Sequence, residues 1–275
     1  MVVSYALFIA LGFGIGTVGT LIGAGGGFIL VPLMLLLFPD LSAQSITAIS
    51  MAIVAINATS GSVAYMKSKR IDYRSGILFA IATIPGSVLG VLTTQVIPRT
   101  LFNIIFGIIL FVVSGYLFAF GGKRKPLTRK AVQSGHTVRR FTDGDGHEYT
   151  YSYNLRHGII LSTLVGFFSP LLGIGGGIIH VPAMTEWLLF PAHIATATSH
   201  FILAIMATVS VIVHLVEGSY SQYLITLIVP LAIGVIPGAL VGARLSKKVN
   251  GIFIVRALAV CLAIVGIRIL WLAFL

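Results

Sequence analysis

The sequence predicts an all-α polytopic membrane protein built from two inverted structural repeats. Each repeat is expected to hold a glycine-broken helical hairpin followed by three long helices. Three observations support this class: 57% of the residues are hydrophobic and only 9% are charged, long apolar stretches fill the chain, and motifs recur in the same order. Since soluble proteins carry roughly 25% charged residues, a soluble enzyme, a nucleic-acid-binding domain and a disordered chain are excluded.

The long apolar stretches predict the membrane helices. A helix needs about 20 apolar residues to cross the hydrocarbon layer. Stretches of this kind cover residues 2–22, 43–66, 75–97, 100–120, 192–216, 221–243 and 251–275. We therefore expect a multi-pass protein of the cell (cytoplasmic) membrane, with the lipid bilayer as its surroundings and with no nucleic-acid partner despite a net charge of +11.

Two sets of motifs recur at nearly constant spacing. Residues 23–32 read GAGGGFILVP and residues 173–182 read GIGGGIIHVP, while IPGSVLG at 84–90 has its counterpart IPGALVG at 236–242. The chain thus divides into a first membrane repeat, 1–120, a linker, 121–157, and a second membrane repeat, 158–275.

The segment after each glycine cluster is too short to cross a membrane. Residues 28–38 and 178–190 cover roughly 16–20 Å at 1.5 Å per residue, against a hydrocarbon core of about 30 Å. We interpret both as half-helices of broken hairpins, and the sequence leaves open whether the hairpins are re-entrant or fully spanning.

The distribution of basic residues predicts the orientation. Loops 67–74 and 244–250 are basic, the linker 121–157 carries eight basic residues, and 217–221 has none. Placing basic loops inside makes helices 43–66 and 192–216 run in opposite directions, so the repeats are inverted. The linker is then cytoplasmic and both termini are extracytoplasmic. Strand-forming residues around Asp143-Gly144-Asp145-Gly146 predict a small β-hairpin within the linker.

Inverted repeats with interrupted helices are typical of secondary transporters, with the substrate site where the repeats meet. A glycine run is poor helix material and allows close backbone approach. Helices that begin there would direct free N–H groups and a positive dipole end at an anion. We therefore expect substrate binding at Gly25, Gly26, Gly27, Gly175, Gly176 and Gly177. Close helix packing is the alternative, and we assign it to the x-x-x-spaced pairs Gly12/Gly16, Gly86/Gly90 and Gly238/Gly242.

Polar side chains inside the apolar stretches are further candidates, because burying them in a membrane is costly. His200 is the leading one, since it follows two hydroxyl residues and an imidazole can bind an anion or carry a coupled proton. The alternative is a histidine bonded to a neighbouring carbonyl. The substrate-binding candidates are Ser50, Asn57, His180, Thr198, Ser199 and His200.

Three residues are candidates for gating. Pro85 and Pro237 occupy equivalent mid-helix positions, where proline kinks a helix, so they are either hinges or packing features. Arg244 follows the second proline motif and would guard the cytoplasmic mouth, or simply mark topology.

These motifs resemble a known family. G-x-G-G-G-x-x-x-V-P in both halves, Ala-Thr-Ser-His at 197–200 and P-G-x-x-x-G in the fourth helix are similar to the TauE/SafE family, also called the toluene sulfonate uptake permease family. The resemblance spans nearly the whole chain, although the linker is longer and more polar than in typical members. It implies transport of sulfite, sulfoacetate or other sulfonates.

The sequence therefore predicts a secondary transporter that moves small sulfur-containing anions by alternating access. A passive anion channel of the same architecture and a transporter of a non-sulfur organic anion are the alternatives. We expect no enzyme activity, no catalytic residues, no cofactor and no metal site, because acidic residues are few and scattered. The coupling ion (proton or sodium), the direction of transport and homodimerisation are left open.

Overall fold

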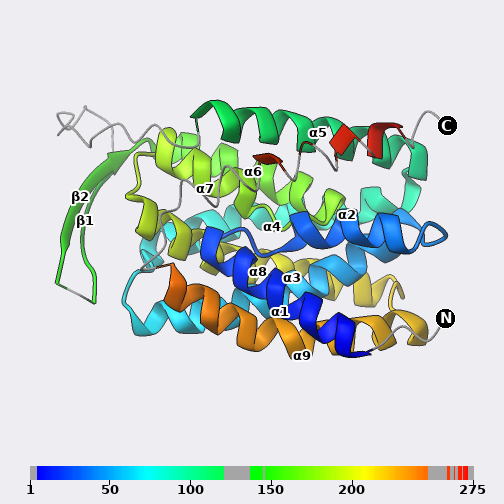
Figure 1. Ribbon diagram of the computed structural model, residues 1–275. Helices are drawn as coiled ribbons and strands as arrows, with labels where there is room; N and C mark the ends of the chain where they lie inside the picture. Colours follow the sequence, from blue (N-terminus) through cyan, green and yellow to red (C-terminus); the bar gives the residue numbers. More distant parts are fainter. Residues whose placement is uncertain are drawn as a thin grey trace.

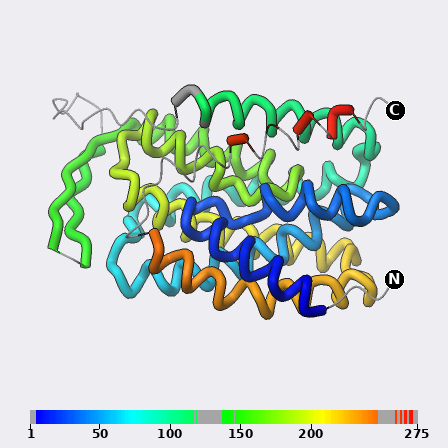
Figure 2. The backbone as a smooth tube through the Cα atoms, in the orientation of Figure 1, coloured from blue at the N-terminus to red at the C-terminus, as the bar shows by residue number. Residues whose placement is uncertain are grey.

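The computed structural model describes residues 5–120, 137–144, 146–246, 259–260, 263, 266–267 and 269–271. Most of the predicted last helix, 251–275, and linker residues 121–136 lie outside this part of the chain. The described elements are α1 (Tyr5–Ile22), α2 (Gly27–Leu37), α3 (Ala43–Lys67), α4 (Tyr73–Val96), α5 (Arg99–Phe120), β1 (Thr137–Thr142), β2 (Glu148–Tyr153), α6 (Leu155–Leu172), α7 (Gly177–Glu186), α8 (Ala192–Val216) and α9 (Gln222–Leu245). Figures 1 and 2 show the helices as one bundle, with the two strands at one end.

Seven of the described helices are long and apolar enough to cross a membrane. This agrees with the predicted all-α polytopic membrane protein. The short α2 and α7 follow the two glycine clusters, as the sequence predicts. Helix α7 ends at Glu186 rather than at residue 190. Leu189 has a left-handed φ of 57°, which ends a helix, and Pro191 is already the N-cap of α8.

Each broken hairpin enters and leaves the bundle at the same end. The rings of Phe8 in α1 and Phe38 after α2 are 6.3 Å apart, and those of Tyr153 before α6 and Phe190 after α7 are 5.1 Å apart. Phe38 precedes the start of α3, whereas Phe190 precedes the start of α8. The first hairpin therefore enters at the end of the bundle where α3 starts, and the second enters at the end where α8 starts.

Helices α3 and α8 run antiparallel through the middle of the bundle. The amide of Asp72, after α3, donates to Thr198 Oγ1 near the start of α8 at 3.0 Å. At the other end, Gln44 Nε2 at the start of α3 donates to Ser219 Oγ after α8, also at 3.0 Å. We call the first the strand end, because β1 and β2 lie there, and the second the opposite end.

The two halves of the chain are interleaved rather than placed side by side. α1 of the first half packs on α9 of the second, and α4 of the first half packs on α6. A Cβ on Gly12 would lie 2.2 Å from Leu231 O, and one on Gly238 would lie 2.3 Å from Phe13 O. Such backbone contact confirms that these x-x-x-spaced glycines serve helix packing.

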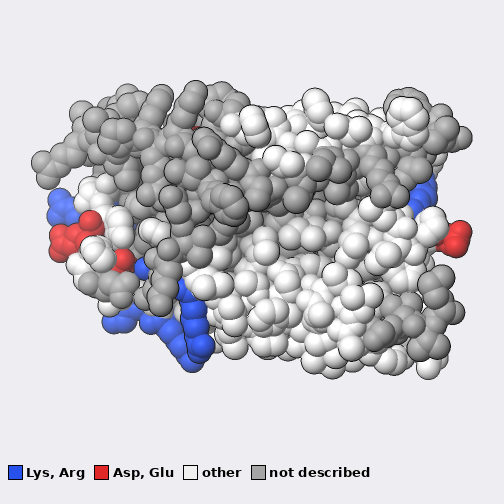
Figure 3. Space-filling model, viewed as in Figure 1, with Lys and Arg blue, Asp and Glu red and all other residues white. Residues whose placement is uncertain are grey.

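Basic side chains gather at the strand end. Figure 3 shows Lys and Arg concentrated at this end and along its lower edge. The described basic residues of its loops and helix ends are Lys67, Lys69, Arg70, Arg74, Arg139, Arg140, Arg156 and Arg244. Arg99 lies at the opposite end, where its guanidinium donates to Leu41 O. The basic loops that the sequence predicts on one side of the membrane thus lie at one end of the molecule. That this end faces the cytoplasm stays a prediction.

Strands β1 and β2 pair antiparallel within the linker, with Arg139 opposite Tyr151 and Thr137 opposite Tyr153. Side chains alternate between the bundle and solvent, because successive residues of a strand point to opposite faces. Tyr151 and Tyr153 are buried, while Arg140 and Thr150 are exposed.

Candidate functional site at the crossing of the glycine breaks

The two glycine breaks meet in the middle of the bundle. A Cβ on Gly27 would lie 2.2 Å from Gly173 O, and a Cβ on Gly177 would lie 2.1 Å from Gly23 O. These are equivalent contacts, since residues 27 and 177, and 23 and 173, are each 150 positions apart. We call residues 23–27 and 173–177 the glycine crossing; all ten are buried.

Left-handed backbone conformations explain why glycine is used in the breaks. Gly25 and Gly26 have φ values of 77° and 86°, and Gly175 and Gly176 have φ values of 79° and 58°. Side chains other than hydrogen strain this conformation. The breaks therefore depend on glycine for their backbone angles and also for the close contact between them.

Two serines at equivalent positions bind the carbonyls of the crossing. Ser50 Oγ in α3 donates to Gly173 O at 2.6 Å, and Ser199 Oγ in α8 donates to Gly23 O at 3.3 Å. Each serine thus comes from one half and binds the break of the other. The predicted candidates Ser50 and Ser199 lie at the crossing together with the six predicted glycines.

The first turns of α2 and α7 begin at the crossing. Their N-caps are Gly26 and Gly176, which have no side chain to cap the first N–H groups, although the N–H of Gly177 donates to Gly175 O. Ile29 and Leu30 in α2 donate to Gly26 O, and Ile179 and His180 in α7 donate to Gly176 O. A helix N-terminus carries a partial positive charge, so two of them meet where the halves touch.

A polar cluster of Thr20, Asn57 and His200 lies beside the first break. Asn57 Nδ2 donates to Gly25 O at 2.9 Å, and Thr20 Oγ1 donates to Asn57 Oδ1 at 2.8 Å. Thr20 Oγ1 is also 3.3 Å from His200 Nε2. Because the single hydroxyl proton is given to Asn57, we assign the Nε2 proton to His200, which then donates to Thr20.

This assignment leaves Nδ1 of His200 as a lone pair. Nδ1 is buried and makes no hydrogen bond of ordinary geometry among the described residues, but the backbone carbonyls of Gly23 and Asn57 lie close enough to the imidazole to interact with it, as in the alternative that the sequence leaves open. A buried polar atom of this kind is unusual and calls for an explanation. It can accept a proton, after which the imidazole is a cation with two donors.

His200 also packs against one face of α3. A Cβ on Gly61 would lie 2.5 Å from His200 Nε2, and the ring of Tyr65 meets the imidazole edge-on at 5.8 Å. Tyr65 donates its hydroxyl to Thr20 O at 2.8 Å. Sequence reasoning missed Thr20, Gly61 and Tyr65. A signal for two of them exists, since Asn57, Gly61 and Tyr65 follow at intervals of four on one helix face.

Two predicted binding residues lie away from the crossing. His180 Nε2 is 3.1 Å from Ser162 Oγ, and its ring lies 6.4 Å from that of Phe79. Thr198 accepts the Asp72 amide at the strand end. Since successive helix residues are rotated by about 100°, Thr198 cannot share the direction of Ser199.

The predicted gating residues lie on outer surfaces. Pro85 and Pro237 are exposed inside α4 and α9, and the glycine after each packs on α6 or α1. Arg244 is exposed in the last turn of α9 at the strand end. Among the described residues, there is no group of three or more His, Cys, Asp or Glu side chains that could hold a metal ion.

A bundle of membrane-length helices around two broken hairpins that meet at its centre defines a polytopic membrane protein of the transporter class. The chain belongs to the sulfite exporter TauE/SafE family, whose family model matches residues 8–269. It is a membrane transporter of that family.

Named relatives are similar along most of the chain. "Probable membrane transporter protein YunE" of Bacillus subtilis (strain 168) is 33% identical over 274 residues, which is 98% of each chain. "Probable membrane transporter protein MJ0441" of Methanocaldococcus jannaschii is 25% identical over 258 residues, covering 89% of this chain and 87% of the relative. No solved structure matches.

Proposed function

We propose that the protein is a secondary transporter that moves small sulfur-containing anions, such as sulfite, sulfoacetate or other organosulfonates, across the cell (cytoplasmic) membrane. The observation that carries the proposal is the glycine crossing, where the N-termini of α2 and α7, which belong to different halves, converge. Their partial positive charge allows such a site to bind an anion even though it contains no charged side chain. The family description, sulfite exporter, supports a sulfur oxyanion as the substrate class.

Alternating access is the mechanism that the contacts favour. The residues of the crossing are buried, so a substrate reaches them only if the elements around the crossing move apart at one end. The matched contacts of Gly27 with Gly173 and Gly177 with Gly23 support two inverted repeats that rock about the crossing. A passive channel of the same architecture is the alternative, and it would need a continuous open path.

Several polar groups at the crossing would take part in this mechanism. Separation of the breaks frees the hydroxyls of Ser50 and Ser199 from the carbonyls of Gly173 and Gly23. These hydroxyls and the first N–H groups of α2 and α7 then become donors for anion oxygens. Protonation of His200 at Nδ1 would add a charged donor, so a proton stands beside sodium as a candidate coupling ion.

The substrate class is tested by thermal unfolding of the purified protein with sulfite, sulfate, thiosulfate, sulfoacetate, taurine, acetate and phosphate. A ligand at 100 times its Kd stabilises a protein by about 2.7 kcal/mol. We expect a raised melting temperature with sulfite or a sulfonate. A raised melting temperature with acetate or phosphate alone would contradict the sulfur-anion proposal and favour a non-sulfur anion as the substrate.

A further inference from the structure

The β1–β2 hairpin is fixed to the second half of the chain. Tyr153 at the end of β2 is followed by Asn154, whose side chain caps α6 by accepting from Arg156 N at 3.0 Å. The rings of Tyr151 and Tyr153 pack on Phe190, with centroids 4.6 Å and 5.1 Å away. The hairpin therefore moves with α6 and with the segment that leads into α8.

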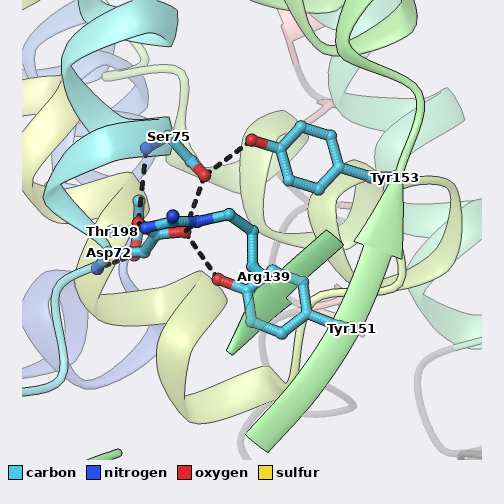
Figure 4. Close-up of polar contacts among 6 residues, drawn as sticks. All are labelled: Asp72, Ser75, Arg139, Tyr151, Tyr153 and Thr198. Carbon is cyan, nitrogen blue, oxygen red and sulfur yellow. Dashed lines mark hydrogen bonds and ion pairs between the residues drawn. The ribbon is translucent and has the colours of Figure 1, made fainter. Parts of the chain in front are cut away.

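The same hairpin also contacts the first half, where the Tyr153 ring meets that of Phe79 in α4 edge-on at 5.8 Å and where one buried carboxylate is the charged link. Asp72 lies between α3 and α4 and is 1% exposed. Arg139 donates to both of its oxygens, from Nε at 3.0 Å and from Nη2 at 2.5 Å, and the Tyr151 hydroxyl donates to Oδ2 at 2.7 Å (Figure 4). Since Arg139 and Tyr151 are opposite each other in the strand pair, one cross-strand pair holds the carboxylate.

Neighbouring groups complete the network around Asp72. Ser75 Oγ donates to Asp72 Oδ2 and is 2.6 Å from the Tyr153 hydroxyl, while the Asp72 amide donates to Thr198 (Figure 4). A second attachment joins Gly144 N at the tip of the hairpin to Ser68 O at 3.0 Å. Asp72 thus ties α3 and α4 of the first half to the hairpin and to α8.

Charge makes this attachment stronger than the contacts at the opposite end. Burial alone would raise the pKa of Asp72, but hydrogen bonds from Arg139, Ser75 and Tyr151 outweigh it and lower the pKa. Charge-assisted bidentate bonds are about twice as strong as neutral ones. At the opposite end, the described bonds between the halves are neutral: Gln44 to Ser219 Oγ, and the Tyr220 hydroxyl to Ala48 O at 3.1 Å.

We propose that the β1–β2 hairpin is a latch that holds the two halves together at the strand end and biases the transporter toward the state closed there. The proposal rests on the alternating access proposed above. Opening at this end requires Arg139 and Tyr151 to release Asp72, whereas the described hydrogen bonds between the halves that opening at the opposite end would break are neutral. The latch sets the balance between the two states without contacting the glycine crossing.

Cysteine labelling at two equivalent positions tests the latch. In a Cys261→Ser background, Ala197→Cys reports on the strand end, because Ala197 is fully buried beside Thr198. Ala48→Cys, also fully buried, reports on the opposite end. The rate at which each cysteine reacts with a water-soluble maleimide is measured in detergent. It is compared between the protein with the native Arg139 and the Arg139→Gln variant.

The latch predicts opposite changes at the two reporters. Arg139→Gln should raise the labelling rate at residue 197 about tenfold, the effect of losing a hydrogen bond to a charged group, and lower it at residue 48. Arg140→Gln, which changes the exposed neighbour in the same strand, should leave both rates unchanged. Tyr151→Phe keeps the ring on Phe190 and should give a smaller rise at 197.

An unchanged rate at residue 197 in both Arg139→Gln and Tyr151→Phe, in protein that elutes as a single species, overturns the latch. Anion flux into proteoliposomes is measured with the same variants. Flux with unchanged labelling leaves the transport proposal standing and removes the latch. Labelling that changes as predicted while no sulfur anion crosses with any variant removes the proposed substrate and leaves the latch standing.

Discussion

A single methyl group at Gly27 should wedge the glycine crossing apart. Its Cβ would lie 2.2 Å from Gly173 O, while ordinary van der Waals contact begins at 3.4 Å, so the shortfall is 1.2 Å (3.4 minus 2.2). The atom in the way is backbone, which cannot rotate aside. Gly177→Ala makes the equivalent clash, with Gly23 O at 2.1 Å, and should behave alike.

The cost of this wedge follows from overpacking. Inserting a methyl group into a packed core costs about 1–3 kcal/mol. At roughly 2–4 °C per kcal/mol, the melting temperature should fall by about 2–12 °C. Gly14→Ala is the matched control: it lies inside α1 with nothing within 4 Å of its Cβ, so it should gain up to about 1 kcal/mol from helix propensity.

The assay is thermal unfolding of the three purified variants, followed by anion flux in proteoliposomes. Gly27→Ala and Gly177→Ala should both melt below the unmodified protein and lose flux, and Gly14→Ala should do neither. If Gly27→Ala melts as high as Gly14→Ala, the two breaks do not touch as described, and the reasoning about the crossing is refuted.

Three further outcomes are expected. His200→Ala should lose the thermal shift given by sulfite or a sulfonate, whereas Thr208→Ala, exposed on the same helix, should keep it; equal shifts would remove His200 from the site. Asn57→Ala should lower the free energy of unfolding by about 1–3 kcal/mol, because Gly25 O and Thr20 lose their partner in a buried site, and denaturant unfolding measures it. Because the folded pKa of Asp72 is lowered, its stabilisation is present above the ordinary value of 3.8 and is lost as pH falls through the lower folded pKa. The stability difference between the native protein and Asp72→Asn should therefore be constant from about pH 5 to pH 8; a decline within that range would contradict the assignment.

The helices and the broken hairpins were predictable from local pattern. Apolar length alone located α3 and α8, since the predicted 43–66 and 192–216 differ from the observed helices by one residue at most. The glycine breaks were predictable because glycine runs disfavour helix and the segments after them are too short to span a membrane.

Helix partners could not be predicted in this way. Membrane helices are apolar all round, so their sequences do not tell which face meets which neighbour. The interleaving of α1 with α9 depends on glycines that resemble packing glycines anywhere, and their partners are set by the whole bundle.

Residues of the candidate site were predictable where the residue type is rare in an apolar helix. They were not predictable where the direction of the side chain decides which network it joins. Asn57 and His200 stood out as polar groups in apolar helices, but Thr20 did not differ from other membrane threonines. Thr198 and Ser199 are adjacent in sequence and point to different networks. Asp72 was the acid of a basic loop, and nothing local could pair it with Arg139, 67 positions away.

Counterflow in proteoliposomes tests the central claim most directly. Vesicles containing the protein are loaded with unlabelled sulfite or sulfoacetate and diluted into a trace of the same labelled anion. Alternating access at the glycine crossing predicts that the label accumulates transiently inside above its outside concentration, and that Gly27→Ala abolishes this overshoot. Label that rises only to equality, at a rate independent of the internal anion, would contradict the account and identify a passive channel.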